Sequence, residues 1–107
     1  MTKIISLSQQ NDITLRLTAD GKKVIFDAWF DSPDDRAANI TYAVPVEEYR
    51  KKLEELRTAG SVDLISEDIS NYLKLTKNTD GKVHYDARVE RMGVGGNSEK
   101  TIDGITF

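Results

Sequence analysis

The chain has 107 residues, carries a net charge of −3, and contains no cysteine and a single histidine. This length fits one domain, residues 1–107, with a core that needs no disulfide or metal. The missing cysteines exclude disulfides, thiolate catalysis and cysteine-based zinc sites, and the charge lacks the basic footprint of nucleic-acid-binding domains. No apolar run approaches the ~20 residues that span a bilayer, and the first residues lack the apolar core of a signal peptide. We therefore expect a cytoplasmic protein that binds neither nucleic acid nor membrane.

The first part of the chain predicts a β-hairpin, with residues 3–8 as a candidate edge strand before it. The first arm has apolar residues at every second position, namely Ile13, Leu15 and Leu17, which is typical of a strand with one solvated face. The Asp20-Gly21 pair supplies the positive φ of a tight turn, and residues 23–31 form the returning strand.

The returning strand has large apolar residues on both faces. One face carries Val24, Phe26, Ala28 and Phe30, and the other carries Ile25, Asp27, Trp29 and Asp31. Because a strand has only two faces, the Trp29 side must lie away from the core that the first face joins. Either another part of the fold covers Trp29, such as a second sheet or residues 102–107, or this side chain is exposed.

The helix is the clearest element of the sequence. It begins after Pro45, which stops the strand predicted at residues 40–44 and is well tolerated at the first helical position. Its apolar residues recur at helical spacing on one face: Val46, Tyr49, Leu53 and Leu56. Gly60 is a natural left-handed stop, so we expect a helix with one apolar stripe that packs on a sheet.

Further strands are predicted after the helix, at residues 62–65, 72–77 and 83–89, with a bend at residues 66–71 and a hairpin turn at residues 78–81. Gly93–Ser98 predicts a flexible loop, and residues 102–107 predict either a final strand or a tail pinned by Phe107. No internal repeat is visible. Strands joined by short turns run antiparallel. The fold class is therefore α+β, a curved antiparallel sheet of six to eight strands with a single amphipathic helix on one face.

Several polar groups invite a catalytic or metal-binding interpretation, but the sequence favours solvated surfaces. The densest acidic group, Asp27, Asp31, Asp34 and Asp35, does not have the spacing of an EF-hand loop. A second group, Asp63, Glu67 and Asp68, lies on a domain too small to build a sugar cleft easily. His84 and Asp86 share a strand face about 7 Å apart, which disfavours a direct bond. The Gly93–Gly96 segment lacks the lysine of a phosphate-binding loop. We predict no enzymatic activity, no catalytic residue, no cofactor and no metal.

The face of Trp29 is the predicted partner-binding site, and its members are Trp29, Ile25, Asp27 and Asp31. Tryptophan is enriched in the hot spots of protein interfaces, where polar groups often surround an apolar anchor. Acidic residues around that anchor favour a partner with a basic surface. Burial of Trp29 within the fold is the competing interpretation.

Residues 44–91, VPVEEYRKKLEELRTAGSVDLISEDISNYLKLTKNTDGKVHYDARVER, give a strand, one amphipathic helix, two strands and a hairpin. This order of predicted elements resembles that of small bacterial domains of unknown function, including immunity-type proteins of polymorphic toxin systems such as the wall-associated-protein (WapI-like) immunity family. The resemblance covers about half of the chain and rests on apolar patterns. It implies a non-catalytic protein that binds another protein, and it assigns no functional residue.

The leading hypothesis is a small non-catalytic protein-binding module of immunity or inhibitor type. The alternative is a small-ligand or carbohydrate-binding β domain, in which Trp29, Tyr42 or Tyr85 stacks on a ligand in a concave sheet face. An enzyme that uses His84 as its near-neutral base is the least favoured hypothesis. Exposed edge strands also leave a two-fold homodimer open.

Overall fold

The computed structural model describes residues 3–8, 12–31, 37–89 and 92–107. The strands through residue 89 and the helix follow one another in the predicted order, whereas the last strand lies at residues 92–101 instead of 102–107. The strands before the helix are β1 (Ile4–Ser6), β2 (Asp12–Leu17), β3 (Lys23–Asp31) and β4 (Ala37–Pro45). Helix α1 (Val46–Ala59) is followed by β5 (Ser61–Asp68), β6 (Asn71–Lys77), β7 (Lys82–Val89), β8 (Met92–Thr101) and a short 3-10 helix, η1 (Ile102–Ile105).

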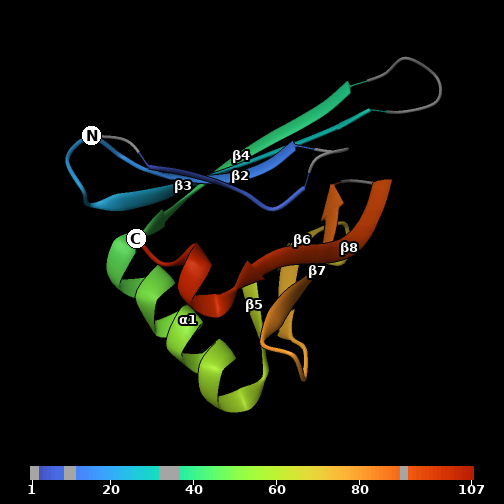
Figure 1. The fold of residues 1–107 in the computed structure, drawn as a ribbon. Coiled ribbons are helices and arrows are strands. Elements are labelled where there is room, and N and C mark those ends of the chain that lie inside the picture. The colour runs from blue at the N-terminus through green and yellow to red at the C-terminus, as the bar shows by residue number, and fades with distance from the viewer. Residues whose placement is uncertain (1–2, 9–11, 32–36, 90–91) are drawn as a thin grey trace.

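The strands form two antiparallel sheets of four strands each, in the orders β1-β2-β3-β4 and β5-β6-β7-β8. We call them the N-terminal sheet and the C-terminal sheet. In Figure 1 the N-terminal sheet is the upper layer, and α1 packs beneath it beside the C-terminal sheet. The α+β class, the antiparallel pairing and the single amphipathic helix are confirmed. The strands divide into two sheets rather than one because α1 lies between β4 and β5, so each half of the chain completes its own meander.

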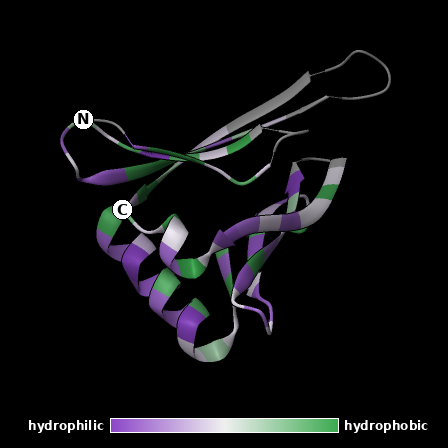
Figure 2. Cartoon of the chain, in the orientation of Figure 1, coloured by the Kyte–Doolittle hydropathy of each residue, from purple (hydrophilic) through white to green (hydrophobic). Residues whose placement is uncertain are grey.

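The core lies between the two sheets and α1 and forms one continuous cluster of buried side chains. Helix α1 contributes Tyr49, Leu53 and Leu56 from its predicted apolar stripe. Figure 2 shows hydrophobic and hydrophilic residues interspersed along this helix. Gly60 ends the helix with a φ of 85°, the left-handed conformation that favours glycine.

The C-terminal residues complete the core against the helix. Ile105 is fully buried in η1, and its carbonyl accepts a hydrogen bond from the Tyr49 hydroxyl. The Phe107 ring lies 5.5 Å from the Tyr49 ring, measured between centroids. Residues 102–107 do not form the predicted final strand. They form η1 and a short tail in which Phe107 packs on Tyr49, which is the other predicted structure.

The segment Gly93–Ser98, which the sequence predicted as a flexible loop, is instead most of strand β8. It pairs with β7 from Arg88↔Gly93 to Val83↔Ser98. Gly96 lies opposite Tyr85, and a Cβ built at position 96 would lie only 2.8 Å from the Tyr85 hydroxyl oxygen. The tyrosine ring therefore covers the glycine, which replaces the side-chain packing that a glycine-rich strand otherwise lacks.

Strand β5 (Ser61–Asp68) also extends further than predicted, through the first half of the bend expected at residues 66–71. A β-bulge between Asp63 and Ile65 turns both Leu64 and Ile65 toward the core. This extra residue shifts the alternation of apolar residues, so the sequence pattern alone ended the strand too early.

The β2–β3 and β6–β7 hairpins repeat one short pattern that the sequence analysis did not identify. Each turn is followed by Val, one variable residue, an aromatic residue, Asp and Ala, at residues 24–28 and 83–87. In both turns an aspartate oxygen, Asp20 Oδ1 or Asp80 Oδ1, accepts the backbone N–H two residues later at 3.0 Å. The registers match as well, since Leu15 pairs with Phe26 and Leu75 pairs with Tyr85. The core-facing sides of the two sheets are therefore built alike.

Candidate functional site

The predicted residues of β3 lie on the outer face of the N-terminal sheet, which we call the Trp29 face. Their neighbours Val24, Phe26 and Ala28 are buried in the core, so the strand alternation turns Ile25, Asp27 and Trp29 outward. All three are half-buried. The fourth predicted residue, Asp31, ends β3 opposite Ala37, and its side chain lies outside the described part of the structure.

Neither element that was expected to cover Trp29 lies over it. The C-terminal sheet packs against the inner face of the N-terminal sheet, and Phe107 contacts Tyr49. In Figure 1 no described element lies over the outer face. Among the described residues, the tryptophan is therefore shielded only by its neighbours on the sheet, and it is half-buried rather than covered by another element.

Asp27 occupies the centre of the Trp29 face and is held from both neighbouring strands. Arg16 Nε on β2 lies 3.1 Å from Asp27 Oδ2, and the Thr41 hydroxyl on β4 donates to Asp27 Oδ1 at 2.7 Å. The ion pair is 41% and 33% exposed, so its contribution to stability is at most about 1 kcal/mol. Because Arg16 already balances this carboxylate, Asp27 gives less support to a basic partner than the sequence suggested.

The structure adds residues to this face that sequence reasoning missed. Ile4 on β1 is 65% exposed and pairs with Arg16, which pairs with Ile25. A row of side chains thus crosses all four strands from Ile4 to Ala43. Ile4 was missed because β1 has only three residues, too few to show an alternation of apolar and polar positions. The pairing of Arg16 with Asp27 was missed because it depends on the register between two strands.

The Trp29 face has two apolar spots on either side of a polar centre. Ile25 and Trp29 are four residues apart on one strand, or about 13 Å, and Asp27 lies between them. Ile4 and Ala43 extend the Ile25 spot across neighbouring strands. Such an arrangement can bury apolar side chains of a partner, while polar contacts with Asp27, Arg16 and Thr41 fix the orientation of that partner.

The equivalent outer face of the C-terminal sheet is polar. By register, His84 corresponds to Ile25, Asp86 to Asp27, and Arg88 to Trp29. His84 Nδ1 lies 3.0 Å from Asn97 Oδ1 across the ladder, and the Tyr72 hydroxyl donates to Asp86 Oδ2 at 3.4 Å. This fold therefore accepts polar and charged residues at the positions that Ile25 and Trp29 occupy.

The groups considered for catalysis make structural contacts. His84 contacts Asn97 and not Asp86. In the second acidic group, Glu67 accepts a hydrogen bond from the Tyr42 hydroxyl at 3.3 Å, and Asp68 accepts one from the Ser70 N–H at 2.7 Å. Burial, together with the nearby Glu67 carboxylate, raises the pKa of Tyr42 to about 12.

Metal ligands do not gather in the described part of the chain, where no group of three or more His, Cys, Asp or Glu side chains could hold an ion. Asp34 and Asp35, from the first acidic group, lie outside the described residues. Among the described helices, none is both long and apolar enough to cross a bilayer.

The aromatic residues considered for ligand stacking do not share a surface. Trp29 lies on the outer face of the N-terminal sheet, whereas Tyr42 lies on its inner face with its ring 6.5 Å from that of Phe26. Tyr85 is buried on the inner face of the C-terminal sheet. The structure therefore does not assemble the concave stacking surface of the carbohydrate-binding alternative from these three residues.

Comparison with known proteins gives no relative from which a function could be inferred. No protein-family model, no curated protein and no solved structure matches this chain. The resemblance of residues 44–91 to WapI-like immunity proteins therefore stays a prediction.

Proposed function

We propose that the chain is a non-catalytic protein-binding module that holds a protein partner against the Trp29 face. An inhibitor or immunity role, in which the bound partner is blocked, is the specific form of this proposal. The observation that carries it is the contrast between the two outer faces, with Ile25 and Trp29 on one sheet and His84 and Arg88 on the other.

The argument from this contrast is energetic. An apolar side chain left half in water gains little from folding, and burial stabilises by about 25 cal/mol per Å² of apolar surface. Since the C-terminal sheet folds with polar residues at the same positions, folding does not require Ile25 or Trp29. Contact with a partner would complete the burial of both side chains, and tryptophan is the residue most enriched in interface hot spots.

Affinity capture with matched variants tests the proposal. The tagged full chain is incubated with lysate of the cells that produce it, beside the variants Trp29→Arg and Ile25→His, and the captured proteins are identified by mass spectrometry. Both variants introduce the residue found at the equivalent position of the C-terminal sheet, so we expect them to fold. Arg88→Ala is the control on the opposite sheet.

We expect one stoichiometric protein on the wild-type chain and on Arg88→Ala, with tenfold or greater loss of affinity for Trp29→Arg. Capture that is equal for all four chains would place the contact elsewhere. Circular dichroism and urea titration of each variant separate loss of the face from loss of the fold.

A further inference from the structure

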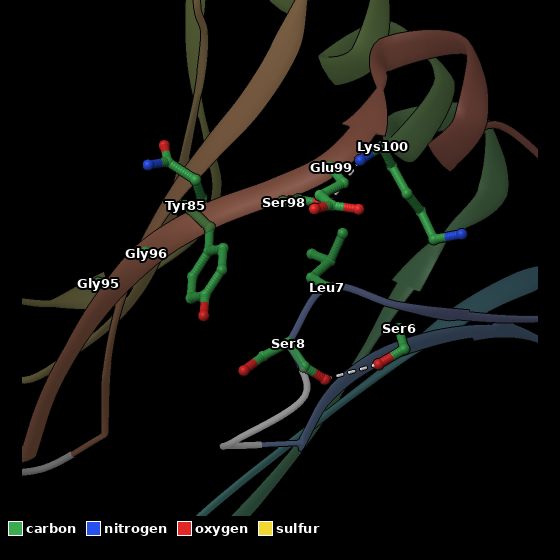
Figure 3. Close-up of a pocket in the computed structure, with 10 residues that line it drawn as sticks. Ser6, Leu7, Ser8, Tyr85, Gly95, Gly96, Ser98, Glu99 and Lys100 are labelled. Carbon is green, nitrogen blue, oxygen red and sulfur yellow. Dashed lines mark hydrogen bonds between the residues drawn. The ribbon is translucent and has the colours of Figure 1, made fainter.

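A groove separates the end of β1 from β8, on the side of the N-terminal sheet opposite the Trp29 face. Its volume is about 620 Å³, and it is lined by residues 6–8, Tyr85 and residues 95–100. Leu7 and Tyr85 are buried at its base. Figure 3 shows residues 6–8 on one wall and β8 along the other.

The β8 wall is the free edge of a sheet. Among the described strands, β8 pairs only with β7, so alternate backbone N–H and C=O groups along its other side have no partner strand. The Lys100 N–H bonds to Ser98 Oγ at 3.1 Å, which marks one end of this free edge. Two residues of this wall, Gly95 and Gly96, have no side chain. The edge thus lets another backbone approach closely.

Tyr85 presents a polar group inside the groove. The residue is only 5% exposed, and Figure 3 shows its ring extending from the strand with the hydroxyl directed into the groove near Ser8. Among the described residues, no buried side-chain polar atom lacks a hydrogen-bond partner, so this hydroxyl is not sealed unpaired inside the protein. A phenol hydroxyl that faces an open groove is suited to bind a carbonyl or amide of a ligand.

We propose that this groove binds an extended peptide segment of another protein, which adds to the C-terminal sheet beside β8. Backbone groups of the peptide pair with the β8 edge, alternate side chains rest on Leu7 and Tyr85, and the Tyr85 hydroxyl donates to a peptide carbonyl. Strand addition of this kind takes its affinity from main-chain hydrogen bonds and its specificity from alternate side-chain pockets. The proposal does not depend on the Trp29 face, which lies on the other side of the N-terminal sheet.

The geometry favours a single strand over other occupants. Residues 6–8 form the wall opposite β8. If the edge strand of a second copy paired with β8, the next strand of that copy would collide with residues 6–8. Gly95 and Gly96 leave part of the β8 wall as bare backbone, which suits a repeating backbone partner better than a compact small molecule. Glu99 and Lys100 carry opposite charges at one end, so no strongly charged peptide is required.

Selection from a random heptapeptide phage library on the immobilised full chain tests this site. The most enriched peptide is synthesised, its Kd is measured by fluorescence anisotropy, and its contacts are mapped by amide chemical shifts. We expect shifts at residues 95–99, and a Kd that rises when alternate peptide nitrogens are methylated but not when the intervening nitrogens are. Removing one neutral hydrogen bond with Tyr85→Phe should weaken binding about two- to tenfold.

Tyr42→Phe is the matched control, because the Tyr42 hydroxyl bonds to Glu67 and does not line the groove. The proposal fails if no peptide is enriched, or if the shifts map to the Trp29 face. If no methylation changed the Kd, the groove would recognise only the side chains of the peptide, and the proposed strand addition would be wrong. Shifts at residues 95–99 that depend on protein concentration without peptide would assign the edge to a second copy.

Discussion

The two sheets of this protein are alike where they face the core and different where they face outward. On the inner side, Leu15 and Phe26 match Leu75 and Tyr85. On the outer side, Ile25 and Trp29 are replaced by His84 and Arg88. Packing constrains the inner positions of both sheets equally, whereas the outer positions are free to differ. The residues that differ are therefore the better candidates for function.

The groove adds a second difference between the sheets. Tyr42 on β4 and Gly96 on β8 occupy equivalent places, opposite Phe26 and Tyr85 respectively. A tyrosine in β4 fills the space beside Phe26, whereas a glycine in β8 lets Tyr85 lie over its own sheet. The exchange of one side chain for a glycine thus helps to create the base of the groove.

The largest effect that tests the likeness of the inner faces is expected for Leu15→Ala and Leu75→Ala. The two side chains are 1% and 0% exposed at equivalent positions. Each substitution should lower the free energy of unfolding by about 2–5 kcal/mol, from lost burial and the cavity left behind. Urea unfolding measures both. If one substitution lowered the free energy of unfolding by several kcal/mol less than the other, the two inner faces would not be equivalent.

A smaller loss is expected for Gly96→Ala, because the new methyl group would press on the Tyr85 ring. Overpacking of this kind costs about 1–3 kcal/mol. Gly93→Ala is the control in the same strand, with nothing within 4 Å of its Cβ position, and should change stability by no more than about 0.5 kcal/mol. If the two variants were equally stable, the Tyr85 ring would not be fixed over Gly96.

The smallest effect concerns the tyrosine that joins the two halves, since Tyr42 on β4 bonds to Glu67 on β5. Its pKa is raised from 10.0 to about 12, first by burial and then by Glu67. The folded state therefore favours the neutral phenol, so stability is complete below pH 10 and falls as the pH rises toward 12. Urea midpoints between pH 9 and pH 12 should decline less steeply for Tyr42→Phe. If the urea midpoints of the two proteins declined equally with pH, other groups would cause the decline. Tyr49 is one of them, because burial also raises its pKa.

The clearest local patterns were sufficient to predict most of the fold. The helical spacing from Val46 to Leu56, with Pro45 before it and Gly60 after it, predicted the limits of α1. The Asp-Gly turns predicted both central hairpins. Strand β8 was missed because glycine has low strand propensity, and only the cross-strand contact with Tyr85 compensates for it.

The candidate site was predicted in part for a similar reason. Alternation along one strand is enough to separate Ile25, Asp27 and Trp29 from the core-facing residues. It does not reveal Ile4, Arg16 or Thr41 as members of the same face, because those residues come from other strands and join it only through the register.

The sequence by itself determined the α+β class, the order of the elements through β7 and the side of β3 on which Trp29 lies. These follow from periodicity and turn chemistry, which act over a few residues. Only the tertiary structure decided that the strands divide into two sheets, that Asp27 is paired with Arg16, and that a groove lies between β1 and β8. Each of these depends on residues far apart in the chain, whose contacts form only when the two meanders and α1 enclose a common core.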